Sequence, residues 1–300
     1  MRFLSGRCSY GHGQEQHNEK QPEDSARLVP AMTEEEVLNL VKMHIDRADI
    51  DYIATRSEIG LKPDGQPLYI LLKNVVPNKL CQSAYPVALR VADTSVIGGS
   101  RADAAGMRLE FKSRKDGEKT NCRAVPHAPH LEGAMNGNLG SLANDTCRKT
   151  ALTGQHWELF KAMLKLARLV DSVFRKHIPQ RYAVQAEAAS RIDQQFVISG
   201  TAFTTMTVNK NFRTAVHRDK NDLKSGFGAL SMLTAGKFKG GELAFPRYRV
   251  AVNYRMGDVL LADLHEPHAN LPFVGVKGEF NRLSLVFYFY ERLLKVCPHR

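Results

Sequence analysis

The chain has 300 residues, 43% of them hydrophobic and 24% charged, so it can bury a sizeable core as one large domain or two modest ones. No apolar run approaches the roughly 20 residues of a membrane-spanning helix, and the first residues lack the apolar stretch of a secretory signal, which excludes both. The 42 Lys and Arg residues against 31 Asp and Glu residues give a charge of +11, which favours a polyanionic partner, although basic proteins often use charge only for solubility. We therefore expect an intracellular protein, nuclear in a eukaryote and cytoplasmic if bacterial or phage-encoded, with no membrane and no obligate protein partner.

The N-terminal half predicts helices and long loops. Residues 1–30 are polar and indicate a poorly ordered leader, and residues 31–300 are expected to form a single domain. Within it, residues 31–195 should be helical and rich in loops. A capping box at residues 33–36 begins a first helix, and residues 68–72 form an apolar run typical of a buried strand.

Two further helices are predicted after a long irregular stretch. Residues 98–150 are rich in Gly, Asn, Lys and Arg and show little periodicity, which predicts long loops. Residues 155–177 carry large apolar side chains at helical spacing, and Pro179 is expected to end that helix. A short second helix is predicted over residues 184–193.

Residues 196–292 are expected to form a β-rich core. The run 196–208 is dense in β-branched and aromatic residues, and shorter strands separated by Gly and Pro follow it. Regularly spaced short strands are typical of a sandwich or a jelly-roll barrel, so the predicted fold class is α+β with supporting helices. The shorter strands are expected near residues 228–234, 241–245, 249–254, 258–263 and 282–290.

The five cysteines are odd in number and contain no CxxC pair, which argues against a disulfide framework and predicts unpaired thiols. One alternative is a zinc site, but its spacing matches no common zinc finger: Cys122, His127, His130 and Cys147.

A His and an Asp two residues apart suggest a metal site. In an extended strand, His217 and Asp219 would project to the same face, and His268 could complete the set from 51 residues further on. Two imidazoles and one carboxylate form the facial triad of non-haem iron(II) oxygenases. His265 competes with His268 for the third position, and we prefer His268 because it follows Pro267 at a turn. Taken alone, the HxD pair would more often be an ordinary surface pair.

Arg282 and Ser284 are also two residues apart in a predicted strand. A guanidinium can hold a carboxylate with two parallel hydrogen bonds, and a hydroxyl on the same face adds a third. This pair would suit the distal carboxylate of 2-oxoglutarate while the keto acid end chelates iron. Taken alone, Arg282 would more simply be an ordinary Arg on an edge strand. The order HxD, then His, then RxS is much less frequent by chance than any one of its parts.

Residues 201–234 resemble the TET/JBP dioxygenases, and residues 240–243, 257–263 and 268–270 continue the likeness in order. The resemblance covers about residues 196–292 and is strongest to the thymine-hydroxylating J-binding proteins of trypanosomatids. It implies a double-stranded β-helix that oxidises the 5-methyl group of a pyrimidine in DNA with Fe(II), 2-oxoglutarate and O2. Residues 31–300 would then be one dioxygenase domain with its β-helix core at 196–292.

Residue by residue, the likeness implies iron ligation by the triad of His217, Asp219 and His268 and cosubstrate binding by Arg282. Arg213 resembles the position of a second cosubstrate-binding Arg. Asp222 matches an acidic residue that faces the target base in some members, or is a solvated loop acid. Weaker candidates for substrate binding are Asn209 and Asn270.

The expected partner is DNA with the target base flipped out of the helix, because a methyl group inside duplex DNA cannot reach a buried metal. We favour 5-methylcytosine over thymine as the base, on its frequency in the wider family. Alternatives are thymine hydroxylation, a protein or small-molecule hydroxylase, and an inactive DNA-binding module. The likeness includes no long C-terminal DNA-binding extension. Contacts with DNA are therefore expected from basic residues before the core: Arg101, Arg108, Lys112, Arg114 and Lys115. These charges could also simply face solvent.

Overall fold

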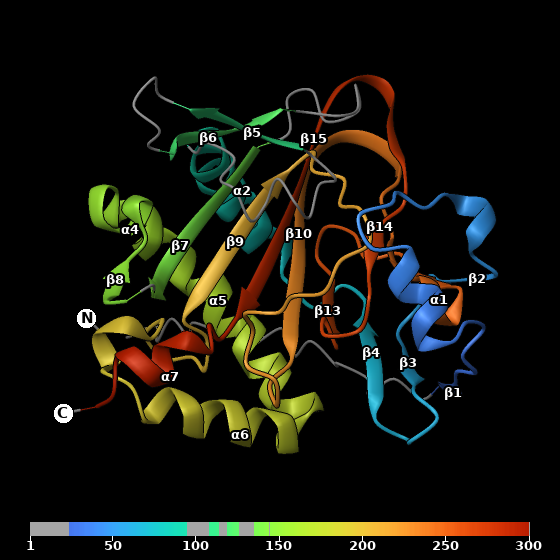
Figure 1. Ribbon diagram of the computed structural model, residues 1–300, viewed down its shortest axis with the longest axis horizontal. Coiled ribbons are helices and arrows are strands. Elements are labelled where there is room, and N and C mark those ends of the chain that lie inside the picture. The colour runs from blue at the N-terminus through green and yellow to red at the C-terminus, as the bar shows by residue number, and fades with distance from the viewer. Residues whose placement is uncertain (1–23, 95–107, 114–118, 126–134, 144, 300) are drawn as a thin grey trace, which may run out of the picture.

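Two facing β-sheets form the centre of the protein (Figure 1). The computed structural model describes residues 24–94, 108–113, 119–125, 135–143 and 145–299, with only the backbone described for β5 (Arg108–Ser113) and β6 (Lys119–Val125), which form a separate pair. The larger sheet has nine strands in the order β1 (Ser25–Arg27), β3 (Glu58–Leu61), β4 (Pro67–Leu72), β13 (Val259–Ala262), β10 (Gly228–Gly240), β15 (Phe273–Tyr288), β9 (Thr205–Lys210), β7 (Met135–Ala143) and β8 (Cys147–Lys149). The smaller sheet has four strands in the order β14 (Ala269–Asn270), β11 (Leu243–Phe245), β12 (Val250–Val252) and β2 (Tyr52–Ala54).

The strands at the centre of the large sheet are buried on both faces. On β13, Val259 and Leu261 join the apolar core beneath the helices, while Leu260 and Ala262 join the core between the two sheets. Side chains alternate between the faces of a strand, so a strand covered on both faces needs apolar residues at every position. This is why β4 and β13 appear in the sequence as uninterrupted apolar runs.

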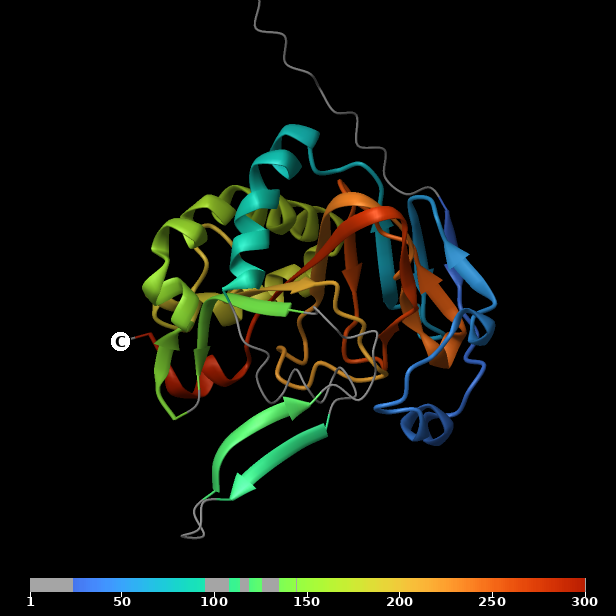
Figure 2. The same cartoon turned by 90° about the horizontal axis from the view of Figure 1, so that it is seen from above.

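Helices cover the outer face of the large sheet. Figure 2 shows α2 (Asn78–Asp93) and α5 (Trp157–His177) along the same side of it. The buried apolar residues of both helices belong to the core between the helices and the large sheet. The remaining helical segments are α1 (Glu34–Asn39), η1 (Arg47–Asp49), α4 (Ala151–Gln155), α6 (Pro179–Ser190), η3 (Gln194–Phe196), η4 (Pro246–Tyr248) and α7 (Arg292–Val296).

Several predicted elements are confirmed at nearly the expected bounds. Thr33 and Glu36 form the predicted capping box of α1, since each side chain binds the backbone N–H of the other residue. The amphipathic helix is α5, and β4 matches the predicted strand at 68–72. The short helix predicted at 184–193 is α6, which begins earlier, at Pro179, because proline fits the first turn of a helix.

Part of the predicted loop region is instead β-structure. Strands β5 to β8 lie within residues 98–150, and residues 135–140 of β7 pair with β9. The β7 sequence has little apolar pattern because polar side chains bond across the pair: Asn136 Nδ2 donates to Asn209 Oδ1 at 3.3 Å, and Thr207 Oγ1 donates to Asn138 Oδ1 at 2.7 Å. Such a strand gives no hydrophobic signal.

Two further boundaries differ from the prediction. The strand expected over 196–208 begins only at Thr205, because the preceding residues form turns, with Gly200 at a φ of +79°. The expected leader includes β1, which pairs with β3 in parallel, while residues 1–23 lie outside the described residues. Strands from before residue 196 therefore belong to both sheets, and the sheets extend beyond the predicted core of 196–292.

The expectation of unpaired thiols is wrong for one pair of cysteines. A disulfide joins Cys147 on β8 to Cys297 just after α7, although the two are 150 residues apart. An odd number of cysteines does not exclude one bridge, and sequence alone does not give connectivity. Cys81 is free and buried. The alternative zinc site is contradicted at Cys147, and its other candidate side chains lie outside the described residues.

Candidate metal centre

The HxD residues lie in the segment between β9 and β10, not in a strand as predicted. His217 forms a single antiparallel bridge with His268, in which each backbone N–H donates to the other residue's carbonyl at 3.0 Å. The N–H of Asp219 donates to Leu264 O at 3.0 Å. The backbone of one segment is therefore fixed against the other, and this brings residues 51 positions apart in the sequence to one point.

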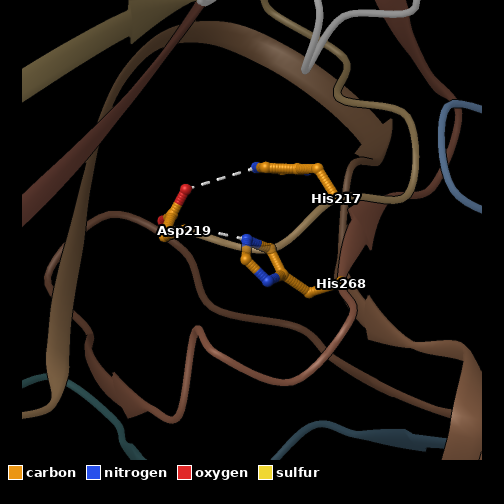
Figure 3. Close-up of side chains that lie close together, drawn as sticks. All are labelled: His217, Asp219 and His268. Atoms are coloured by element: carbon orange, nitrogen blue, oxygen red, sulfur yellow. Dashed lines mark ion pairs between the residues drawn. The ribbon is translucent and has the colours of Figure 1, made fainter. Parts of the chain in front are cut away.

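The side chains of His217, Asp219 and His268 converge, as Figure 3 shows. Their possible ligand atoms all lie within 4.8 Å of one another. His217 Nε2 is 3.6 Å from Asp219 Oδ1, and His268 Nε2 is 3.9 Å from Asp219 Oδ2. Two nitrogens and one carboxylate with this spacing suit a single divalent ion and match the donor set of the facial triad.

Backbone carbonyls orient both imidazoles. His217 Nδ1 lies 2.8 Å from Ala215 O, and His268 Nδ1 lies 2.9 Å from Glu266 O. A carbonyl oxygen only accepts, so each Nδ1 carries the proton and each Nε2 presents its lone pair to the cluster. Burial, followed by the neighbouring His217, lowers the pKa of His268 from 6.5 to about 4, which keeps its ring neutral at physiological pH.

The low pKa of His268 predicts how the metal-free protein responds to acid. The unfolded state takes up a proton near pH 6.5 and the folded state only near pH 4, so the free energy of unfolding should decrease as pH falls through that window. Urea unfolding in chelator between pH 4.5 and 7.5 measures this decrease. The His268→Gln variant should lose part of the pH dependence, and an unchanged profile would contradict the assignment.

His265, the other candidate for the third ligand, points elsewhere. Its Nδ1 lies 3.5 Å from Asp263 Oδ1, and its Nε2 lies 3.3 Å from Asp222 O. The hydrogen bond with Asp263 raises the pKa of His265. Asp263 also accepts a hydrogen bond from Lys62 at 3.0 Å, so this group forms its own network beside the metal ligands.

A pocket between the two sheets opens at the metal cluster. Asn209 on β9, Asn270 on β14 and Ser284 on β15 contribute polar atoms to its wall. The other lining residues are Thr214, Leu230, Leu243, Tyr254, Leu264 and Val286 together with the three candidate ligands. The pocket therefore joins the metal cluster to Ser284, whereas the other two residues predicted to bind the cosubstrate, Arg282 and Arg213, are not among its lining residues.

Arg282 and Ser284 lie on β15, as predicted, and the Arg282 side chain is fully buried. Arg282 Nη2 donates to Gly241 O at 2.9 Å, whereas Nε and Nη1 have no hydrogen-bond acceptor among the described residues. Burial lowers the pKa of the guanidinium even though Tyr254 and the Glu242 carboxylate raise it, which reflects the cost of burying a cation. These features fit a carboxylate ligand such as that of 2-oxoglutarate.

Tyr254 belongs to the same polar group, although the sequence gave no reason to select it. Its hydroxyl lies 2.9 Å from Ser284 Oγ, and its side chain is buried and lines the pocket. Gly241 leaves the space that Arg282 fills, because a Cβ there would lie 2.9 Å from Arg282 Nε. A single tyrosine outside a motif carries no sequence signal.

The structure places the weaker candidates in different surroundings. Asn209 and Asn270 line the pocket, and Asn270 Oδ1 accepts a hydrogen bond from Thr214 Oγ1 at 3.1 Å. Asp222 is buried, and its backbone bridges to Tyr290. Arg213 donates from Nη2 to Ile45 O at 2.8 Å and to Asp46 Oδ1 at 3.0 Å.

The basic residues expected to contact DNA are only partly described. Arg108 and Lys112 lie on β5, where the side chains are not described, and the others lie outside the described residues: Arg101, Arg114 and Lys115. Among the described residues, no helix combines the length and apolar character that crossing a membrane requires.

A profile of the Tet/JBP family, described as the oxygenase domain of the 2OGFeDO superfamily, matches residues 136–291. The chain belongs to this family. Membership implies Fe(II), 2-oxoglutarate and O2 as cofactor and cosubstrates. The match includes every candidate site residue named above, from Asn209 to Ser284.

Relatives in sequence include two kinds of trypanosomatid protein. The chain is 34% identical over 217 residues to the bifunctional helicase and thymine dioxygenase JBP2 of Leishmania braziliensis, an alignment that covers 69% of this chain and 19% of the relative. It is 34% identical over 149 residues to the thymine dioxygenase JBP1 of Trypanosoma brucei brucei, covering 49% of this chain and 17% of the relative. The chain thus spans less than a fifth of the length of these relatives.

A solved structure with the same fold is NgTET1 in complex with 5mC DNA. It aligns over 89% of this chain and 94% of its own, with a TM-score of 0.55 and 14% sequence identity. At that identity the likeness concerns the fold alone. Together with the two facing sheets, it confirms the predicted α+β fold with a double-stranded β-helix core and supporting helices.

Proposed function

We propose that this chain is an iron(II)- and 2-oxoglutarate-dependent dioxygenase that oxidises the 5-methyl group of a pyrimidine base in DNA. The observation that carries the proposal is the pocket that joins the cluster of His217, Asp219 and His268 to Ser284 and Tyr254, which lie beside the buried Arg282. A metal triad and a buried guanidinium close to the same pocket are what an enzyme of this class requires.

Each side chain has a separate role in the proposal. The Nε2 atoms of His217 and His268 and the Asp219 carboxylate hold the iron, and the carbonyls behind the two rings keep them oriented. Arg282 and Ser284 hold the distal carboxylate of 2-oxoglutarate. When bound, the iron and cosubstrate supply the oxidising chemistry that converts a methyl C–H bond to an alcohol.

The pocket is expected to receive a single base flipped from the DNA helix. Its polar walls offer amide groups from Asn209 and Asn270 that can hydrogen-bond a pyrimidine edge. Asp222, buried and three residues after Asp219, is a third candidate. A stacked base cannot approach the metal cluster, because the cluster lies between two sheets. Extrusion of the base is therefore part of the proposal.

Thymine is the base that the sequence relatives favour. The two relatives described above are named as thymine dioxygenases, and each is 34% identical to this chain. The likeness to the structure with 5mC DNA concerns the fold and does not select a base. The sequence-based preference for 5-methylcytosine rested on no particular residue, so we propose thymine first and 5-methylcytosine as the alternative.

Nucleoside mass spectrometry tests this proposal directly. DNA containing both bases is incubated with the protein, iron(II), 2-oxoglutarate and O2, and then digested. Hydroxymethyluracil would identify thymine as the substrate, and hydroxymethylcytosine would identify 5-methylcytosine. The proposal would be overturned if neither product formed while the protein bound metal and consumed 2-oxoglutarate with a peptide or a small molecule as substrate. The Asp219→Ala variant is the control for adventitious oxidation.

A further inference from the structure

Residues 218–226 include Asp219, which lines the metal pocket, and several of the residues after it are exposed. We call residues 218–226 the rim loop. Within it, Lys220 and Lys224 are exposed, while Asp222 and Leu223 between them are buried. The loop therefore presents two cations outward, one of them adjacent in sequence to a candidate metal ligand.

Backbone contacts on its inner side hold the rim loop in place. Leu223 N donates to Phe289 O at 2.9 Å, and Asn221 O accepts from Glu291 N at 2.9 Å. Just after the loop, Phe227 N donates to the side chain of Gln185 at 3.2 Å, and Gln185 is buried. A loop held at these points presents its lysines from a fixed backbone, which lowers the entropy lost when a ligand binds.

The two lysines differ from the neighbouring basic residue in their electrostatic surroundings. Arg218 is paired with Glu34, so its charge is already balanced. No carboxylate of the described residues lies within the 4.0 Å ion-pair distance of the Lys220 or Lys224 ammonium. Two exposed cations without acidic partners, in the segment that contains the pocket-lining Asp219, favour an anionic ligand.

We propose that Lys220 and Lys224 bind the DNA phosphates that flank the flipped nucleotide. This inference rests on the proposed function, because it takes the pocket to be the base site. A base that enters the pocket leaves its sugar and phosphates at the edge, and phosphate contacts fix the position of a protein on DNA. Phosphate binding by the two lysines would then be coupled to the position of Asp219, since the lysines and Asp219 belong to one stretch of backbone.

The salt dependence of DNA binding tests the inference. The double variant Lys220→Gln/Lys224→Gln is compared with Lys161→Gln/Lys165→Gln, which removes the same charge from exposed positions of α5 on the outer face of the sheet. The association constant of the full chain for a DNA duplex is measured between 50 and 200 mM salt. The slope of its logarithm against the logarithm of salt should fall by about 1 for each rim lysine removed.

The control variant should keep the slope of the parent protein, and all three proteins should bind Mn(II) equally, which shows that the rim variant is folded. A loss of slope equal in both variants, or absent from both, would overturn the inference while DNA oxidation by the parent still supported the proposed function. A parent protein that neither binds nor oxidises DNA would overturn both.

Discussion

Replacing Asp219 with alanine is expected to lower the affinity for iron(II) by more than about 100-fold and to abolish base oxidation. Residues that only orient metal ligands already change affinity by roughly 10- to 100-fold, and loss of a ligand should exceed that. Asp219 is the only carboxylate of the cluster, so its loss also removes the negative charge that balances the ion. Calorimetric titration with iron(II) under anaerobic conditions, or with Mn(II), measures the affinity.

The matched control is Asp222→Asn, which removes a carboxylate charge three residues further along the same loop. Asp222 is not part of the metal cluster, so this variant should bind the metal with the affinity of the parent. If Asp219→Ala retained the parent affinity, the ligand set would differ from His217, Asp219 and His268. If both variants lost affinity equally, the effect would come from the loop's charge rather than from coordination.

The sequence was sufficient to select the three side chains that converge in the candidate metal cluster, because two of them belong to one short local spacing. HxD and RxS each bring two functional groups together within three residues, and their order along the chain adds a further constraint. The strand geometry expected for HxD was nevertheless wrong. His217 and Asp219 converge with His268 through a backbone bridge between distant segments, which no local pattern records.

Strand β7 and helix α2 were not predicted from the sequence, for different reasons. Strand β7 is held to β9 by hydrogen bonds of Asn136 and Asn138, and polar side chains of that kind are typical of loops as well. Helix α2 was not predicted although its buried residues recur at helical spacing, because Pro86 in its middle is unfavourable inside a helix. The strands β4 and β13 were predicted because burial on both faces demands apolar residues throughout.

Contacts between residues far apart in the sequence explain the other features that the sequence did not predict. The bridge between Cys147 and Cys297 depends on β8 lying next to α7, which only the folded chain determines. The same holds for Tyr254, whose hydroxyl reaches Ser284 from 30 residues away. The spacing of residues within one segment can be predicted from the sequence, whereas contacts between distant segments can be predicted only when the topology of the fold is known.

Replacing Arg282 with methionine is expected to weaken 2-oxoglutarate binding by roughly 30-fold to several thousand-fold, because loss of one partner from a buried ion pair costs about 2–5 kcal/mol. Calorimetric titration of 2-oxoglutarate into the Mn(II)-loaded protein measures this loss. The free energy of unfolding without cosubstrate should not decrease, because methionine removes a buried cation whose Nε and Nη1 have no hydrogen-bond partner among the described residues. Weaker cosubstrate binding with retained stability separates a binding role from a structural one.

Two matched variants decide which guanidinium holds the carboxylate. Arg282→Lys keeps the charge but loses the planar pair of donors, so its affinity should lie between those of the parent and Arg282→Met. Arg213→Met removes the other predicted cosubstrate ligand, whose Nη2 is engaged by Ile45 and Asp46, and should weaken binding less. Parent-like affinity in Arg282→Met combined with a large loss in Arg213→Met would move the carboxylate site to Arg213. The burial and missing acceptors of Arg282 lead us to expect the opposite order.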